Sequence, residues 1–183
     1  MPVYRRALIE GGSYFFTVVT YNRRKILIDL RARELLREAW ESVQLKFPFS
    51  IPAICLLPDH IHCIWTLPEG DANYSLRWKE IKRLFTNRYL EHVGPGAIRN
   101  ESHQRSGEAA IWQRRFWEHV LRDEEDFNRH VDYIHFNPVK HGLVKEMEEW
   151  PWSSFHRYQK MGYYPKDRYE RISDMVNKMT CGE

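Results

Sequence analysis

The sequence has few cysteines and no long apolar run. Its three cysteines, Cys55, Cys63 and Cys181, are odd in number and have no CxxC spacing. Neither a disulfide framework nor a cysteine zinc site is therefore expected, and any metal must bind nitrogen and oxygen ligands. No segment is apolar enough to span a bilayer, and the first residues, MPVYRRALIEGG, lack the apolar core of a signal peptide. We therefore predict a cytoplasmic protein with no membrane partner.

The remaining composition is typical of a folded protein. Of 183 residues, 43% are hydrophobic and 29% are charged, which argues against disorder and favours a single domain over 1–183. A stretch rich in Gly, Pro, Ser and charges predicts a mobile loop at 91–111, and a C-terminal extension begins at about 158. Aromatic residues reach 14%, so we expect some rings at the surface, where they can stack on bases.

The order of predicted elements defines the fold class. Strands are expected at 13–22, 49–58, 60–68 and 111–121, and amphipathic helices at 29–46, 75–93 and 122–138. Asp123 is a suitable N-cap for the third helix, and Pro138 predicts that this helix ends near Asn137. The order strand, helix, strand, strand, helix, strand, helix predicts an α+β, ferredoxin-like or RRM-like fold, with helices on one face of an antiparallel sheet.

Two histidines lie two positions apart in the segment LPDHIHCIWTLPEG. Because side chains alternate along a strand, His60, His62 and Ile64 share one face, and Ile61 and Cys63 share the other. Imidazole is the commonest protein ligand of divalent metals, so the pair indicates a metal site. Two histidines on a partly solvated sheet face are an equally good explanation of this motif alone.

The third predicted helix carries the polar residues that could complete such a site. Tyr133 and Asn137 are four residues apart and so lie on one helix face, with His130 one turn before Tyr133. Opposed to the two histidines, they would make a metal site of two nitrogens and one oxygen beside a phenol nucleophile. A tyrosine packed at an interface and an asparagine at a helix end are the commoner explanations of these two residues.

Basic and aromatic residues suggest contacts with nucleic acid. Residues 77–88 hold five basic side chains and one acidic one, and a basic stripe of this kind can follow a phosphate backbone or form a solvated helix face. Trp78, Trp112, Phe116 and Trp117 could stack on bases, although each could also belong to the core. The residues predicted to contact DNA are Arg77, Trp78, Lys79, Lys82, Arg83, Arg114, Arg115 and Lys140.

Five segments in order carry a resemblance to a known family. They are YRRALIEGGSYFFTVVTYNRR, LPDHIHCIWTLPEGD, RWKEIKRLFT, RFWEHVLRDEEDFNRHVDYIHFNPVKHGLV and WPWSSFHR. The second contains an HUH motif (His, bulky hydrophobic residue, His), and the fourth resembles the tyrosine-helix signature of single-tyrosine transposases. Over about residues 4–157, the chain resembles the REP-associated tyrosine transposases of the HUH superfamily, where REP stands for repetitive extragenic palindromic.

The resemblance implies roles for specific residues. Tyr133 would be the nucleophile, on a helix that faces the HUH strand. His60, His62 and Asn137 would bind a divalent metal, Mg²⁺ or Mn²⁺. We assign His130 to helix packing or a DNA contact, with metal binding or tuning of the tyrosine as the alternatives.

The resemblance also implies a substrate and a reaction. The substrate would be single-stranded DNA beside palindromic REP-type hairpins, cleaved and rejoined by transesterification through a 5′-phosphotyrosine. The expected protein is bacterial, associates with the nucleoid when bound to DNA, and acts as a monomer with its site in cis. A dimer that exchanges helices is the alternative.

Two other functions fit parts of the pattern. An RRM-like module could bind nucleic acid through the same sheet and basic helix without any chemistry. A small metallohydrolase could use the two histidines to activate water, and would form no covalent adduct with DNA.

Overall fold

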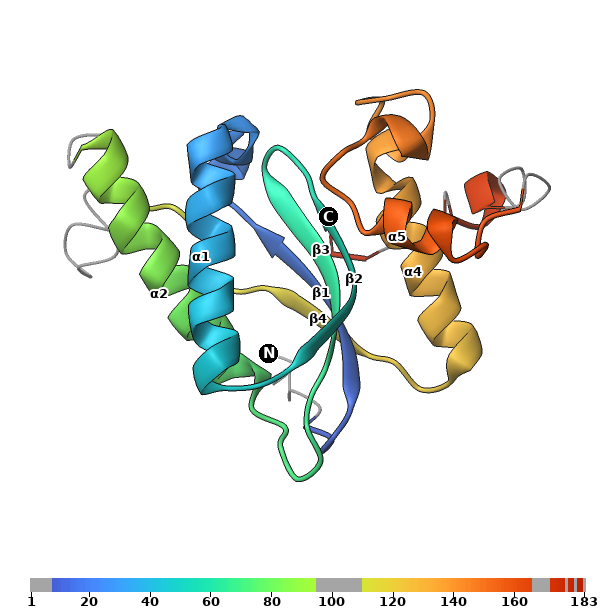
Figure 1. The fold of residues 1–183 in the computed structure, drawn as a ribbon, viewed down its shortest axis with the longest axis horizontal. Coiled ribbons are helices and arrows are strands. Elements are labelled where there is room, and N and C mark those ends of the chain that lie inside the picture. The colour runs from blue at the N-terminus through green and yellow to red at the C-terminus, as the bar shows by residue number, and fades with distance from the viewer. Residues whose placement is uncertain (1–7, 95–109, 166–171, 177, 180, 183) are drawn as a thin grey trace, which may run out of the picture.

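The sheet has four antiparallel strands in the order β2-β3-β1-β4. The computed structural model describes residues 8–94, 110–165, 172–176, 178–179 and 181–182. The strands are β1 (Ser13–Val19), β2 (Ser50–Leu56), β3 (His60–Thr66) and β4 (Trp117–Val120). β2 and β3 form the predicted hairpin, and β1 lies between β3 and β4 (Figure 1). The predicted α+β class with an antiparallel sheet is confirmed.

The helices cover both faces of the sheet, whereas the sequence predicted one face. One core lies between the sheet and the helices α1 (Leu30–Lys46) and α2 (Tyr74–Val93). The other lies beneath α4 (Glu124–Lys140) and α5 (Phe155–Lys160), on the opposite side in Figure 1. In β1, Tyr14 and Phe16 enter the first core and Phe15 enters the second. A strand that is apolar at consecutive positions is typical of a sheet covered on both faces.

The helix α4 begins as predicted but extends further at its C-terminal end. The carboxylate of Asp123 accepts a hydrogen bond from the backbone N–H of Asp126 at 2.7 Å and caps the first turn. Pro138 lies inside the last turn, and the helix continues to Lys140. A proline this close to the end of a helix removes only one backbone hydrogen bond, so the last turn survives. This turn is closed by the hydrogen bond from His141 N–H to the Asn137 carbonyl oxygen.

The predicted mobile loop at 91–111 lies only in part within the described residues. Residues 91–93 form the last turn of α2, and Ala110 and Ile111 are buried. The remainder of the predicted mobile loop, 95–109, lies outside the described residues. Among the described residues, no helix combines the length and apolar character that crossing a bilayer requires.

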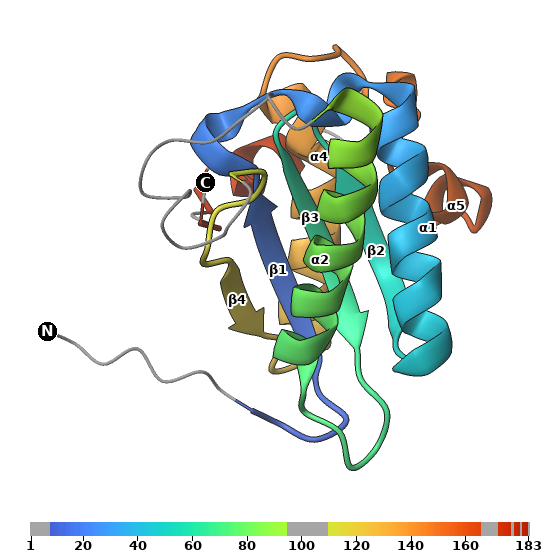
Figure 2. The ribbon, with the colours of Figure 1, turned by 90° about the vertical axis from the view of Figure 1, so that its left-hand side faces the viewer.

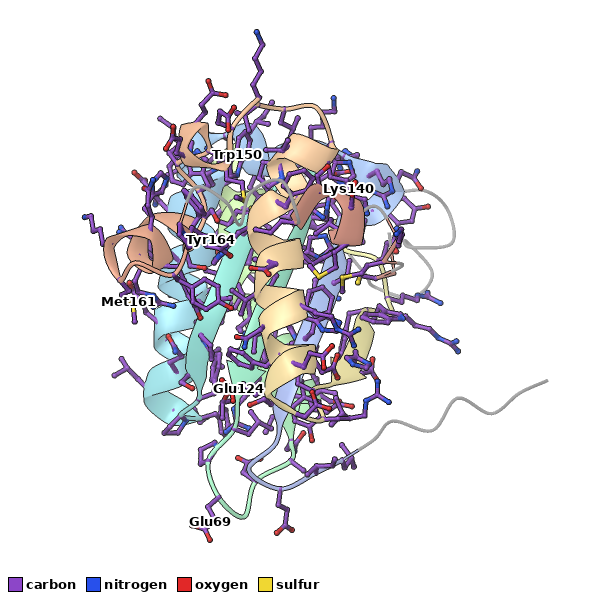
Figure 3. All side chains as sticks on the ribbon, turned by 90° about the vertical axis from the view of Figure 1, so that its right-hand side faces the viewer. Glu69, Glu124, Lys140, Trp150, Met161 and Tyr164 are labelled. Atoms are coloured by element: carbon purple, nitrogen blue, oxygen red, sulfur yellow. The ribbon has the colours of Figure 1, made fainter. Side chains whose placement is uncertain are left out.

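The segment after α4 attaches this helix to the sheet edge. The strand β2 is hydrogen-bonded to the segment that precedes α5. Leu56 N–H donates to the Trp152 carbonyl, and Ser154 N–H donates to the Ile54 carbonyl. The imidazole of His135, on α4, contacts the Ser154 hydroxyl at 2.7 Å and the Tyr164 hydroxyl at 2.6 Å. Burial lowers the pKa of His135 to about 3, so the ring is neutral in this network. Figure 3 shows Tyr164 beside α4, which runs across the sheet from Glu124 to Lys140.

Candidate active site

The two histidines of the HUH motif lie side by side on the sheet face that α4 covers. Both belong to β3 and are buried, with 2% of His60 and 0% of His62 exposed. Their ring centroids are 4.8 Å apart, with an angle of 82° between the rings. Ile61 and Cys63 enter the core on the other face. The strand alternation expected from the sequence therefore holds, and two imidazoles meet in one buried place.

The orientation of the His60 ring leaves one nitrogen available as a ligand. The Nδ1 atom lies 2.6 Å from the Asp59 carboxylate, which can only accept, so Nδ1 carries the proton. Burial disfavours the Asp59 carboxylate, but hydrogen bonds from His60 and Arg23 outweigh this cost and lower the Asp59 pKa. Nε2 of His60 is buried and has no hydrogen-bond partner. An imidazole that donates one N–H to a carboxylate and has an unprotonated second nitrogen is a common arrangement for a metal ligand.

The His62 ring is oriented through a hydroxyl group on β1. Thr17 is paired with His62 in the β1–β3 register, and its Oγ1 lies 3.0 Å from His62 Nδ1. The same hydroxyl donates its proton to the Cys181 carbonyl oxygen at 2.5 Å. Because a hydroxyl has one proton, it accepts from His62, and Nδ1 is the protonated nitrogen. The lone pair of His62 is therefore on Nε2.

These observations show that the site fits a divalent cation. Neutral imidazoles with protonated Nδ1 atoms present lone pairs on Nε2, the form that binds metals. The buried Nε2 of His60, which makes no hydrogen bond, would gain a partner on metal binding. An oxygen ligand and water molecules beside the two imidazoles would suit Mn²⁺ or Mg²⁺.

Tyr133 lies directly against the histidine pair. It comes from the middle of α4, is fully buried, and packs its ring edge-on to His62 with 5.2 Å between the centroids. Phe15 of β1 supports both rings, at 5.5 Å from His62 and 5.8 Å from Tyr133. The Lys140 ammonium lies 3.3 Å from the Tyr133 hydroxyl. The structure thus brings together the phenol and the imidazoles that the sequence singled out.

Asn137 and His130 lie on opposite sides of Tyr133 along α4. Asn137 is fully buried one turn after Tyr133, on the side predicted for a third ligand. His130 lies one turn before Tyr133, and its Nδ1 atom is 2.8 Å from the Asp126 carbonyl oxygen. Its ring packs against Phe15 at 4.8 Å and stacks on His119 at 4.7 Å. His130 therefore packs the helix onto the sheet, one of the two roles expected from the sequence.

A group of histidine and aspartate side chains near the start of α4 has a spacing that could hold a metal ion. Ligand atoms of His119, Asp126 and His130 lie within 4.8 Å of one another. Asp126 also has Arg122 and Arg129 nearby, at 3.5 and 3.9 Å. Two guanidinium groups beside its carboxylate disfavour a bound cation. His119 was not among the residues predicted to form a site, although strand alternation with Trp117 places it on the sheet face that α4 covers.

Arg77 and Trp78 were predicted to contact DNA, and their burial corrects this prediction. Only 2% of Arg77 is exposed, and its guanidinium donates to the carbonyls of Phe47, Pro48 and Asn73 and to the Asp71 carboxylate. Trp78 is 1% exposed and stacks on Trp65 at 4.3 Å. The helix repeat of 3.6 residues turns these two positions towards the protein interior, and a count of charges along the sequence does not detect this.

The other basic residues of α2 line a groove. It has a volume of about 570 Å³ and is lined by residues of α2 and of the segment that leads into β4. Figure 2 shows these two elements. Lys82 donates to the Gln113 carbonyl at 3.0 Å and lies near the rings of Trp112 and Phe116. Arg115 is exposed beside the groove. The groove is lined by basic side chains that the sequence predicted to contact DNA, namely Lys79, Lys82, Arg83 and Arg114.

A buried tyrosine facing an HUH histidine pair on an antiparallel sheet is the arrangement expected for a tyrosine transposase. The chain matches the family model "Transposase IS200 like" over residues 9–137. It is 45% identical over 174 residues to the REP-associated tyrosine transposase of Escherichia coli (strain K12), covering 95% of this chain and 94% of that one.

A solved structure of a REP-associated tyrosine transposase bound to a REP hairpin is also similar. It has a TM-score of 0.77 and 42% identity, and the match covers 100% of this chain and 98% of that chain. The chain therefore belongs to the IS200-like transposase family, among the REP-associated tyrosine transposases that its motifs resemble. The predicted family and enzyme class are confirmed.

Proposed function

We propose that this protein cleaves and rejoins single-stranded DNA beside REP-type hairpins through a covalent 5′-phosphotyrosine. The observation that carries the proposal is the contact between the Tyr133 ring and His62, 5.2 Å apart at their centroids. A phenol nucleophile beside two candidate metal ligands suits phosphoryl transfer. Family membership supports the transposase role.

The reaction is an exchange of phosphate esters. The Tyr133 oxygen attacks the scissile phosphorus, one P–O bond forms, and the bond to the 3′-oxygen of the leaving strand breaks. The phenol gives up one proton and the departing 3′-oxygen takes one up, so no net proton is consumed. Because the ester bond is conserved in the adduct, a 3′-hydroxyl can attack the phosphotyrosine and rejoin the strands.

The metal ligands would be His60, His62 and Asn137. Bound Mg²⁺ or Mn²⁺ would neutralise charge on the scissile phosphate and on the departing 3′-oxygen. Asp59 and Thr17 orient the two imidazoles through their Nδ1 atoms. Because Tyr133 and His62 are fully buried, the phosphate reaches them only when a neighbouring segment moves aside.

The basic groove along α2 is the proposed contact for the DNA backbone. Its lysines and arginines would neutralise phosphates, and the edges of Trp112 and Phe116 border it. The similar REP-associated tyrosine transposase of known structure is bound to a REP hairpin, which supports hairpin DNA as the partner of this protein. The packing of Tyr133 against His62 within one chain supports a monomer with its site in cis.

The test is a denaturing gel of the protein with labelled single-stranded hairpin DNA and Mn²⁺. We expect a shifted band that resists denaturation, requires metal, and disappears in Tyr133→Phe and in His60→Ala/His62→Ala. Cleavage without an adduct would replace the proposal with the metallohydrolase, and binding without cleavage would replace it with the RRM-like module. Binding of the same DNA by both variants provides the control for folding.

A further inference from the structure

Lys140 lies over the nucleophile two turns further along α4. The two residues are seven positions apart, a spacing that returns to the same helix face. The Lys140 Nζ atom is 3.3 Å from the Tyr133 hydroxyl oxygen and 4.8 Å from the centre of its ring. The ammonium therefore contacts both the π-face and the reacting atom of Tyr133. Figure 3 labels Lys140 near the end of α4.

We propose that Lys140 is a catalytic residue whose ammonium stabilises the negative charge on the Tyr133 oxygen. Charge grows on this oxygen as the phenol loses its proton and attacks the phosphorus. It grows there again when the phosphotyrosine bond breaks during strand rejoining. The inference rests on the proposed function and adds the group that assists the nucleophile in both directions.

The surroundings of the phenol explain why such a charge is effective. The Tyr133 ring is fully buried and packs edge-on to the uncharged ring of Phe15 and to His62. Charges interact more strongly in such surroundings than in water. The phenol oxygen accepts a hydrogen bond from the Lys140 ammonium at a distance that can shorten as charge develops.

The contact with the ring prepares Lys140 for this role. An ammonium over the face of a tyrosine is held by the ring electrons even while the phenol is neutral. The side chain of Lys140 is half-buried, so part of its entropy is already lost before the reaction begins. Little rearrangement is then needed when the oxygen becomes charged, which is the condition for efficient electrostatic catalysis.

This role differs from the phosphate contact that the sequence suggested for Lys140. A phosphate contact adds to DNA affinity and leaves the rate at saturating DNA unchanged. A charge on the nucleophile changes the rate of bond formation and leaves affinity nearly unchanged. The two roles can therefore be separated by measuring binding and chemistry independently.

The experiment compares Lys140→Met, Lys140→Arg and the wild type. Adduct formation is measured in a single turnover with saturating hairpin DNA and Mn²⁺, and the Kd for DNA is measured without metal. We expect Lys140→Met to slow the adduct by about 100-fold, the low end of the effect of removing one charge-stabilising donor. Strand rejoining should slow by the same factor, with the Kd changed by less than about threefold. Lys140→Arg should recover most of the rate, because it keeps the positive charge.

The control is Lys160→Met, an exposed lysine on α5, which should change neither quantity. A rate at saturating DNA that is unchanged in Lys140→Met, with a weaker Kd, would overturn the inference and leave Lys140 as a phosphate contact. Equal losses in Lys140→Arg and Lys140→Met would also overturn it, since packing alone would then explain the effect. If the wild type forms no adduct, the proposed function itself is wrong, and the inference about Lys140 is wrong with it.

Discussion

At the scale of single residues, the proposed metal site depends on the groups that orient its candidate ligands as well as on those ligands. Thr17 is not a proposed metal ligand or nucleophile, yet its hydroxyl sets the tautomer of His62. The hydroxyl donates its proton to the Cys181 carbonyl, so it can only accept a hydrogen bond from His62 Nδ1. Asp59 has the corresponding role for His60. Such partners commonly change metal affinity by about 10- to 100-fold.

The role of Thr17 predicts the effect of Thr17→Val, which keeps the shape and removes the hydroxyl. We expect Mn²⁺ affinity to fall by about 10- to 100-fold, because the His62 Nδ1 proton loses its acceptor and the ring is no longer held in the ligating form. Calorimetric titration of the protein with Mn²⁺, without DNA, would measure this affinity.

Thr17→Ser provides the matched control, since it retains the hydroxyl and should bind Mn²⁺ as the wild type does. Equal affinity in Thr17→Val and the wild type would show that His62 is held by other contacts. A loss in both variants would show that packing at this position matters for the affinity, and not the hydroxyl alone.

At the scale of elements, α2 has two faces with separate roles. Arg77 faces inward and holds the chain around Phe47 and Pro48 to the start of the helix. Its hydrogen bond to Asp71 lowers the pKa of that carboxyl. Lys79, two positions later, is exposed and lines the basic groove. Two cations that look alike in the sequence therefore have different surroundings.

These two faces predict opposite effects for two similar substitutions. Arg77→Met should lower the free energy of unfolding by about 3 kcal/mol, because buried carbonyls and the Asp71 carboxylate lose their donor. Lys79→Met should leave that free energy unchanged, weaken DNA binding and reduce the salt slope of log K by about one. Urea unfolding and binding at several salt concentrations would measure the two effects. A stable Arg77→Met protein with weakened DNA binding would restore Arg77 to the DNA-contact set.

The helices and strands also show how much of the structure could be predicted from the sequence. Periodicity located the helices and the first three strands to within a few residues, but the strand predicted at 111–121 is shorter and spans only Trp117–Val120. Alternation placed His60 and His62 together. Periodicity could not place the helices on two faces, because helical spacing shows which side of a helix is buried but not which side of a sheet buries it. Thr17 and His119 were missed for a related reason: their roles depend on strand register and long-range pairing.

At the scale of the whole molecule, the proposed chemistry and the proposed DNA groove lie on opposite faces of the sheet. The groove belongs to the side of α2, and Tyr133 belongs to the side of α4. The strand β4 forms the edge between them, with Phe116 packed towards the first core and Trp117 towards the second. DNA that contacts both sites would have to bend around the sheet, which a flexible single strand can do more easily than a rigid duplex.

The fold also predicts whether one chain is enough for activity. In this structure α4 belongs to the same chain as the histidines it faces, and the His135 network ties it to β2 and to Tyr164 of that chain. These contacts would have to break, or Tyr164 and Ser154 would have to move with α4, before the helix could exchange with a second copy. Mixing Tyr133→Phe with His60→Ala/His62→Ala should therefore restore no adduct, since each chain lacks one half of its own site. Exchange of α4 in a dimer would instead give a functional composite site and recover about a quarter of wild-type activity with random pairing. Prior unfolding and joint refolding of the two variants removes any kinetic barrier to exchange, so adduct recovered after that step would show that the site forms between chains.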